Sequence, residues 1–303
     1  MDSSGPILVT GATGNVGFPL VENLQALGLP VLAATTDLRS GTDEGRRGSV
    51  ETRRLDLEDP KTFRTALAGV KRVFLMRPPQ ISDTKRYMRP FVAAMADAGV
   101  EHVVFLSLMG VNRAMPHWQV EQDLKASTVL WTFLRPSFFA QNLGAAYCAD
   151  IRDHDRIRLA SGRGRTSFID TRDIAAVAAQ VLANPSRHRG QAYTLTGPEA
   201  LDYYRVASTL SAALGRPIIY EPIGLLRYRR ELRAQNLPDA YVNVQLLINA
   251  VARLRLAGRV NATLPRLLGR PPITLDRYVA DHRARWMPEP SGLRPGDPGV
   301  GDE

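Results

Sequence analysis

Three glycines near the start of the chain, Gly11, Gly14 and Gly17, follow one another at G-x-x-G-x-x-G spacing. They suit a turn that receives phosphate groups. The first can make the tight turn, the second lets the backbone approach a pyrophosphate, and the third lets a helix pack close to the preceding strand. The start of that helix would offer free N–H groups and the positive end of its dipole to the phosphates. The spacing therefore predicts a nucleotide-binding loop made of Gly11, Ala12, Thr13, Gly14, Asn15, Val16 and Gly17.

Two further candidates, Asp37 and Arg39, follow an apolar run that ends in Thr35 and Thr36. In dinucleotide-binding sheets this position faces the adenosine ribose. Asp37 could accept hydrogen bonds from the two ribose hydroxyls of NAD. Arg39, with Thr35 or Thr36, could instead hold the 2′-phosphate of NADP. Both are also ordinary turn residues, so these residues leave the choice of cofactor open.

Strands and helices must position these candidates, and the chain supplies them in alternation from residue 6 to about residue 135. Short apolar runs separate amphipathic stretches that have helical periodicity. The alternation predicts an α/β fold in which a doubly wound parallel sheet of the Rossmann type is covered by helices on both faces. Strands are expected over residues 7–9, 31–36, 50–57, 70–76, 102–108 and 128–134.

The rhythm of the sequence changes after Gly144, so we expect an NAD(P)-binding core over residues 1–145. The mixed segment 146–287 would first return to the central sheet over about 166–200. Its other parts, about 146–165 and 215–287, would form a smaller C-terminal substrate lobe, and the Pro/Gly/Asp-rich end (288–303) is expected to be disordered.

Composition argues against several classes of protein. No apolar run reaches the roughly 18 residues that a membrane helix needs, and the short polar N-terminus does not resemble a secretion signal. The net charge of +9 comes from 39 basic residues, of which four are lysines and 35 are arginines spread along the chain. That spread favours a solvated surface over a nucleic-acid site. A single cysteine, Cys148, excludes an internal disulfide and favours the cytoplasm, and no metal site is predicted.

Taken in order, these segments resemble the NmrA-like group of atypical short-chain dehydrogenases/reductases, and within it the NADPH-dependent type 2 quinone oxidoreductases. The likeness runs from Ile7 to about Trp286. Beside the glycine loop it rests on Leu55-Asp56-Leu57, Val73-Phe74-Leu75-Met76, Val104-Phe105-Leu106-Ser107, His117 with Glu121, Leu134-Arg135-Pro136-Ser137-Phe138-Phe139, Phe168-Ile169-Asp170 and Thr196-Gly197-Pro198.

The resemblance implies which segments hold the cofactor. Asp56 and Leu57 would flank the adenine. Many relatives carry an arginine where this chain has Thr36, so the family's preference for NADP(H) over NAD(H) would depend here on Thr36 and Arg39. The nicotinamide half would be lined by Met76, Arg77 and Pro78 at its ribose and by Pro136, Ser137, Phe138 and Phe139 at its ring.

The Tyr-x-x-x-Lys pair of ordinary short-chain dehydrogenases is missing. In that pair the tyrosine donates the proton and the lysine lowers its pKa. Ser107 matches the upstream serine, but His117 and Glu121 share the helical face ten residues later. His117 is therefore the candidate general acid, since an imidazole titrates near neutral pH. Alternatively, His117 only stabilises the helix and Glu121 pairs with Lys125.

A quinone or a related conjugated carbonyl suits such a site, because it accepts hydride readily and its proton can come from water. Aromatic candidates for the substrate pocket are Trp118, Phe138, Phe139 and Tyr147. Together with the resemblance, these residues predict an NAD(P)H-dependent reductase of a small molecule, for example in specialised metabolism. The alternative is an NAD(P)-binding redox sensor or regulator without turnover, a role known in the NmrA group.

Overall fold

The computed structural model of the chain describes residues 5–37 and 50–288. Two predictions lie outside these ranges: the contact of Arg39 with a 2′-phosphate and the disorder of residues 289–303. Within the described ranges, no helix is both long and apolar enough to cross a bilayer.

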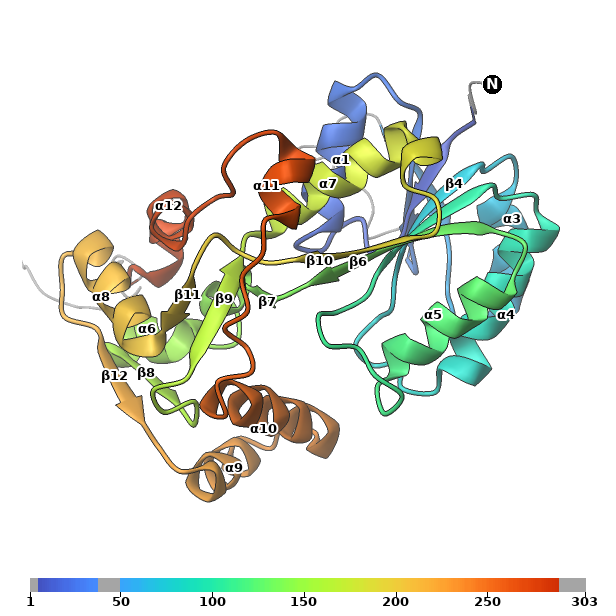
Figure 1. The fold of residues 1–303 in the computed structure, drawn as a ribbon. Helices are drawn as coiled ribbons and strands as arrows, with labels where there is room; N and C mark the ends of the chain where they lie inside the picture. The colour runs from blue at the N-terminus through green and yellow to red at the C-terminus, as the bar shows by residue number, and fades with distance from the viewer. Residues whose placement is uncertain (1–4, 38–49, 289–303) are drawn as a thin grey trace, which may run out of the picture.

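A seven-stranded sheet runs through the molecule, and all of its neighbouring strands are parallel (Figure 1). The strand order is β10-β6-β5-β4-β1-β2-β3. This is the doubly wound Rossmann-type arrangement that the sequence predicted. The direction of winding reverses between β1 and β4, and in such sheets a crevice for ligands opens at the carboxyl ends of the strands there. The strands are β1 (Ile7–Val9), β2 (Val31–Thr35), β3 (Glu51–Arg54), β4 (Arg72–Met76), β5 (His102–Leu106), β6 (Leu130–Pro136) and β10 (Gln191–Leu195).

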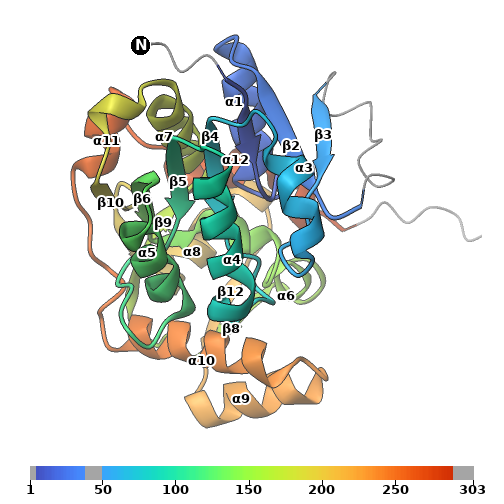
Figure 2. The ribbon, with the colours of Figure 1, turned by 90° about the vertical axis from the view of Figure 1, so that its right-hand side faces the viewer.

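Helices cover both faces of this sheet, as Figures 1 and 2 show. Each face buries its own apolar core against its helices. Because both faces are buried, the central strands β4 and β5 are apolar without alternation, which is typical of parallel sheets. One face carries α1 (Gly17–Ala26), α7 (Thr171–Ala183) and α11 (Thr263–Leu268), and the other carries α3 (Phe63–Leu67), α4 (Thr84–Asp97) and α5 (Pro116–Ala126).

Short acidic residues begin several of the helical segments. Asp59 accepts a hydrogen bond from the N–H of Lys61, and Asp170 accepts one from the N–H of Arg172. Each carboxylate satisfies an N–H group that has no partner within its own helix, and its charge lies near the positive end of the helix dipole.

A separate apolar core lies beyond the end of β6, in the C-terminal lobe. Its largest fully buried side chains are Tyr203, Tyr278 and Trp286. The lobe contains a three-stranded sheet (β11-β9-β7) and a two-stranded sheet (β12-β8). Its elements are β7 (Phe138–Phe139), α6 (Cys148–His154), β8 (Arg156–Leu159), β9 (Arg165–Ile169), β11 (Ala200–Asp202), α8 (Tyr203–Leu214), β12 (Ile219–Pro222), α9 (Leu225–Ala234), α10 (Asp239–Arg253) and α12 (Leu275–Asp281).

One expectation about the sheet was wrong. Strand β9 lies almost wholly within the 166–200 stretch that was expected to return to the central sheet, but it pairs with β7 and β11 instead. The edge beside β6 is taken by β10, so β9 finds its partner in β7, where the chain has already left the central sheet. Within 166–200, therefore, the central sheet gains β10 and is covered by α7. Conversely, α11 belongs to the 215–287 stretch that was expected to form the lobe, but it packs against α7 beside the central sheet.

Two buried carboxylates at the start of α7 attach later segments to this helix. Arg172 bridges Asp170 and Asp281, with a distance of 2.7 Å to each carboxylate. Asp173, which is fully buried, accepts a hydrogen bond from Arg270 at 2.7 Å. Burial raises the pKa of Asp173, and the contact with Arg270 opposes that shift. The two pairs fix the segment around α12 against the layer formed by α7.

Candidate active site

The glycine loop lies where β1 ends and α1 begins. Gly11 has a φ of +62°, which glycine adopts without strain, and its carbonyl accepts the N–H of Gly14 at 2.9 Å. A Cβ on Gly17 would lie 2.1 Å from the Gly11 carbonyl oxygen, so any side chain there would force the backbone to shift. No described side chain caps α1 and no acidic residue stands in its first turn, so its dipole is available to an anion. Of the other loop residues, Thr13 and Asn15 are exposed, whereas Ala12 and Val16 are buried.

Thr10 joins the two strands on either side of the crevice. Its hydroxyl donates to the Phe74 carbonyl at 3.0 Å and accepts the N–H of Met76 at 2.8 Å. Because both contacts reach β4, Thr10 fixes the separation of β1 and β4 where the winding reverses. Sequence reasoning missed this residue. The sequence feature that could have pointed to Thr10 is its hydroxyl side chain directly before Gly11, the first glycine of the loop.

The ends of β2 and β3 form the predicted adenosine side of the site. The Thr35 hydroxyl donates to the Asp37 carbonyl at 2.9 Å and accepts its N–H at 3.3 Å, which closes a tight turn. The side chains of Thr36 and Asp37 are exposed at this edge. Asp56 follows β3, and Leu57 beside it is buried in the core under α3. The structure therefore brings Thr36, Asp56 and Leu57 to one edge of the sheet.

The segment after β4 contacts the glycine loop directly. Met76 packs on Gly11, where a Cβ would lie 2.2 Å from the Met76 Cε. The guanidinium of Arg77 turns back into its own loop and donates to the carbonyls of Pro78 and Ile81. Burial lowers the pKa of Arg77. Its side chain therefore holds the loop in shape, and the ribose contact predicted for this segment is left to Met76 and to the backbone.

Ser107, Glu121 and Arg135 form a buried polar cluster. Ser107 and Glu121 stand where ordinary short-chain dehydrogenases have their serine and their lysine. The Ser107 hydroxyl donates to Glu121 Oε1 at 2.7 Å, and Arg135 Nε donates to the same oxygen at 2.9 Å. Glu121 is only 1% exposed, and a second Arg135 contact satisfies its other oxygen. The suggested pairing of Glu121 with Lys125 is wrong. The ammonium of Lys125 lies instead 5.7 Å from the ring centre of Trp131.

His117 stands in the first turn of α5, close to Arg77 and 6.1 Å from the ring centre of Phe105. Burial and the charge of Arg77 lower the pKa of His117 to about 3. The imidazole is therefore neutral at pH 7. Its Nδ1 is buried and has no hydrogen-bond partner among the described residues. His117 can thus offer a neutral N–H or a lone pair, but it is not an imidazolium acid at neutral pH.

The segment after β6 leads from the sheet into the C-terminal lobe. Pro136 accepts the N–H of Met109 at 2.9 Å, and the N–H of Ser137 donates to the Leu195 carbonyl at 2.8 Å. These contacts fix the backbone between β5 and β10. The Ser137 hydroxyl is buried and finds no hydrogen-bond partner within the described ranges. Such a group is costly unless something satisfies it, so it is a candidate contact for a bound polar molecule.

The predicted aromatic pocket residues do not all lie together. Phe138 and Phe139 are half-buried, and Phe138 meets Phe168 edge-on with ring centres 5.6 Å apart. Trp118 is half-buried on α5. Tyr147 is 7% exposed and lies in the lobe core, where its hydroxyl donates to Gln245 Oε1 at 3.3 Å. Tyr147 therefore packs as a core residue, and the other three remain candidates for the pocket.

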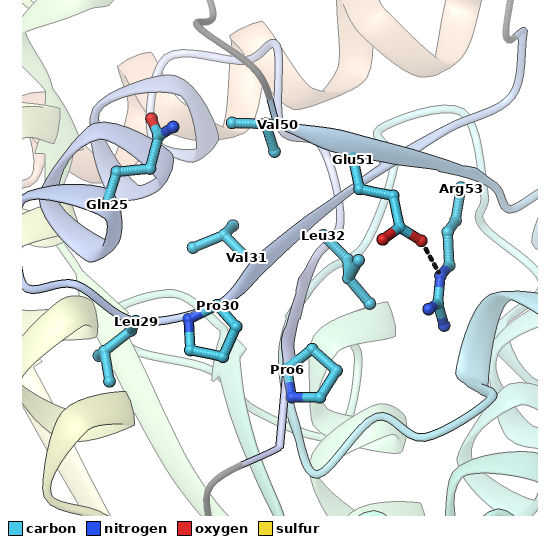
Figure 3. Close-up of a pocket in the computed structure, with 9 residues that line it drawn as sticks. All are labelled: Pro6, Gln25, Leu29, Pro30, Val31, Leu32, Val50, Glu51 and Arg53. Carbon is cyan, nitrogen blue, oxygen red and sulfur yellow. Dashed lines mark hydrogen bonds and ion pairs between the residues drawn. The ribbon is translucent and has the colours of Figure 1, made fainter.

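A cavity of about 350 Å³ lies elsewhere, at the amino ends of β1, β2 and β3 (Figure 3). Its walls include Pro6, Pro30 and Val50, which come just before these strands, and the Glu51–Arg53 ion pair. The glycine loop occupies the opposite, carboxyl edge, so this cavity is not the predicted site. Within residues 5–37 and 50–288, no group of three or more His, Cys, Asp or Glu side chains is arranged to hold a metal ion.

The fold and sequence are similar to those of several known proteins. An NAD(P)H azoreductase of Xenophilus azovorans is 36% identical over 286 residues, which cover 92% of this chain and 99% of that protein. The NADPH-dependent quinone oxidoreductase of Escherichia coli, solved with NADPH, superposes with a TM-score of 0.81 at 24% identity over 92% of this chain and 99% of its own.

The negative transcriptional regulator NmrA, solved with NADP, shares the fold with a TM-score of 0.72 at 17% identity. The match covers 92% of this chain and 95% of the regulator. At 24% and 17% identity, these two solved structures show that the fold is shared. The profile of the NmrA-like family itself matches residues 3–255. This chain belongs to the NmrA-like family.

Proposed function

We propose that this NAD(P)H-dependent oxidoreductase uses NADPH to reduce a quinone or a related conjugated carbonyl in the cytoplasm. The observation that carries the proposal is the glycine turn at the reversal between β1 and β4, where the Gly11 carbonyl leaves no space for a side chain at Gly17. The name of the azoreductase relative, which matches over nearly its whole length, supports a reductase that takes its hydride from NAD(P)H.

The residues present fit this cofactor. Residues 11–17 would hold the pyrophosphate, Asp56 and Leu57 the adenine, and the edge of the sheet beside Thr36 the 2′-phosphate. Met76 and the neighbouring backbone of 77–78 would line the second ribose. The buried hydroxyl of Ser137 would gain a partner in the carboxamide group, beside Pro136. When bound, the cofactor supplies a hydride from its nicotinamide ring.

Phe138 and Phe139 would hold the acceptor ring, and Trp118 would close the site from α5. Their common task is to place the acceptor carbon within reach of the nicotinamide and to exclude water. Orientation of two reactants can lower a barrier by about 7–11 kcal/mol. For a reactive acceptor, such placement would account for most of the rate enhancement that the protein gives to hydride transfer.

The state of the polar groups supports a quinone over a simple ketone. His117 is neutral at pH 7, and both oxygens of Glu121 are already bonded to Ser107 and Arg135. A ketone needs a proton as its alkoxide forms, and a positioned acid is worth about 10²–10⁴-fold. A reduced quinone is a weaker base and can take its proton from water. Among the described residues at the site no strong acid is available, so the site suits the acceptor that does not need one.

The test is a scan of quinones and ketones with NADPH and with NADH, followed by loss of absorbance of the reduced nicotinamide. We expect turnover of quinones with NADPH and little or none of simple ketones. Reduction of ketones in preference to quinones would contradict the substrate assignment. An absence of nucleotide binding would contradict the proposal as a whole.

The sealed Glu121 cluster and the absent tyrosine also favour a second candidate, a redox sensor without turnover. Such a protein would bind the cofactor tightly and contact a partner differently in the two redox states. Single-turnover oxidation of bound NADPH separates the two functions. Cofactor that stays reduced across a broad panel of quinones and ketones would favour the sensor.

A further inference from the structure

We propose that Arg54, the last residue of β3, reads the 2′-phosphate of NADPH. This inference rests on the proposed function, because it concerns the adenosine half of the same site. Sequence reasoning assigned this task to Thr36 and Arg39 and counted Arg54 only among the arginines spread along the chain.

Strand register places Arg54 at the carboxyl edge of the sheet, where the glycine loop begins. Val9, the last residue of β1, is the partner of Ala33 in β2, and Thr35 in β2 is the partner of Arg54 in β3. Thr35 and Arg54 therefore lie two residues beyond the level at which β1 ends and the chain enters the glycine loop. In a sheet of this type the adenosine of a dinucleotide lies along the edge that runs outward from the glycine loop.

The alternation of side chains decides which face Arg54 occupies. Arg53 points toward α3, where its Nη1 donates to the Ala68 carbonyl at 2.6 Å. Leu55 is buried in the core on that same face. Because neighbouring side chains in a strand point to opposite faces, Arg54 points toward the face of α1. That is the face on which α1 begins and the phosphates would bind.

The guanidinium of Arg54 is available to a ligand. It is exposed, and no hydrogen bond or ion pair engages it with another described residue, whereas Arg53 is bound to Glu51 and to α3 carbonyls. Its planar fork of N–H donors matches a phosphate monoester. Asp37 is exposed at the end of β2, the strand next to β3, and its carboxylate would repel a phosphate. A cation from β3 would offset that repulsion.

The test measures the adenosine half alone, with 2′,5′-ADP and 5′-ADP as probes in calorimetric titrations. Arg54→Ala should weaken 2′,5′-ADP binding by about 10- to 100-fold and change 5′-ADP binding by less than about twofold. Arg54→Lys should fall between, since it keeps the charge but loses the fork. Arg64→Ala removes the same charge from an exposed site on α3 and should change neither.

Several results would overturn the inference. Equal weakening of both probes would mean that Arg54 only supports the fold, and unchanged selectivity would mean that another group reads the phosphate. Loss of all discrimination in Arg39→Ala with none lost in Arg54→Ala would return the task to Arg39. In each of these cases wild-type binding of NADPH and quinone turnover would persist, so the proposed function would stand. Failure of the wild type to bind any of these nucleotides would refute both.

Discussion

Replacing Gly14 tests whether the glycine loop receives a pyrophosphate. A Cβ at this position would lie 3.2 Å from the Gly11 carbonyl oxygen, a contact that a shift of a few tenths of an ångström relieves. Gly14 does not have a positive φ, so a side chain adds no backbone strain. Both Gly14→Asn and Gly14→Asp should therefore fold. The two side chains have nearly the same volume, and they differ by one negative charge.

The charge sets the size of the effect. Two like unit charges about 4 Å apart repel by about 1 kcal/mol in bulk water and by about 4 kcal/mol near a protein surface. Gly14 is half-buried, which places the site between these limits. A repulsion of about 2–3 kcal/mol corresponds to roughly 30- to 150-fold weaker binding of NADPH by Gly14→Asp than by Gly14→Asn.

The assay is calorimetric titration of both variants with NADPH and NADH, with thermal unfolding as the check on the fold. The difference between the variants should appear with both cofactors, since both carry the pyrophosphate. It should shrink at about 1 M salt, where the Debye length falls to about 3 Å. Equal affinity of two folded variants would show that no pyrophosphate lies against Gly14.

Other side chains permit further tests. His117→Ala should keep quinone reduction within about tenfold, and the wild-type rate should stay flat between about pH 5 and 8, because the pKa of His117 is lowered to about 3; stopped-flow oxidation of NADPH at several pH values checks both. Acid should weaken the fold through His102, whose burial lowers its pKa from 6.5 to about 4. Below pH 6.5 His102 gains a proton in the unfolded chain, whereas in the folded chain it stays neutral until about pH 4. The free energy of unfolding therefore decreases as the pH is lowered from about 6.5 to 4. In urea unfolding, His102→Gln should abolish roughly 2–3 kcal/mol of the loss between pH 7 and 4, and an unchanged loss would contradict this origin. Glu121→Gln should lower the free energy of unfolding by about 3 kcal/mol because it leaves Arg135 without its carboxylate, whereas Lys125→Ala should cost less than about 0.5 kcal/mol, and similar losses would argue against the buried pair.

Much of the fold follows from local patterns in the sequence. The apolar runs and the amphipathic stretches between them predicted the parallel sheet, since each pattern has its own period and a sheet of this class needs both faces covered. The caps Asp59 and Asp170 depend on local sequence, because each carboxylate satisfies an N–H group only two residues away. The conformation of Gly11 is local in the same sense.

The partners of the polar residues were decided by tertiary structure. The sequence alone suggested that Glu121 pairs with Lys125 one turn away, whereas folding brings Ser107, which follows β5, and Arg135 of β6 to the same carboxylate. Strand β9 was assigned to the wrong sheet for a related reason, because its free partner, β7, is 26 residues or more distant in the chain.

The sequence by itself determined the periodicity of the strands and helices, the position of the glycine turn and the residue types at the carboxyl edge of the sheet. Only the tertiary structure decided that His117 is neutral, that Tyr147 lies in the core of the lobe and that Arg54 pairs with Thr35 at the carboxyl edge. Burial and charge depend on neighbours contributed by other elements. A periodic pattern records which face of an element is apolar, but it does not record which other element will cover that face.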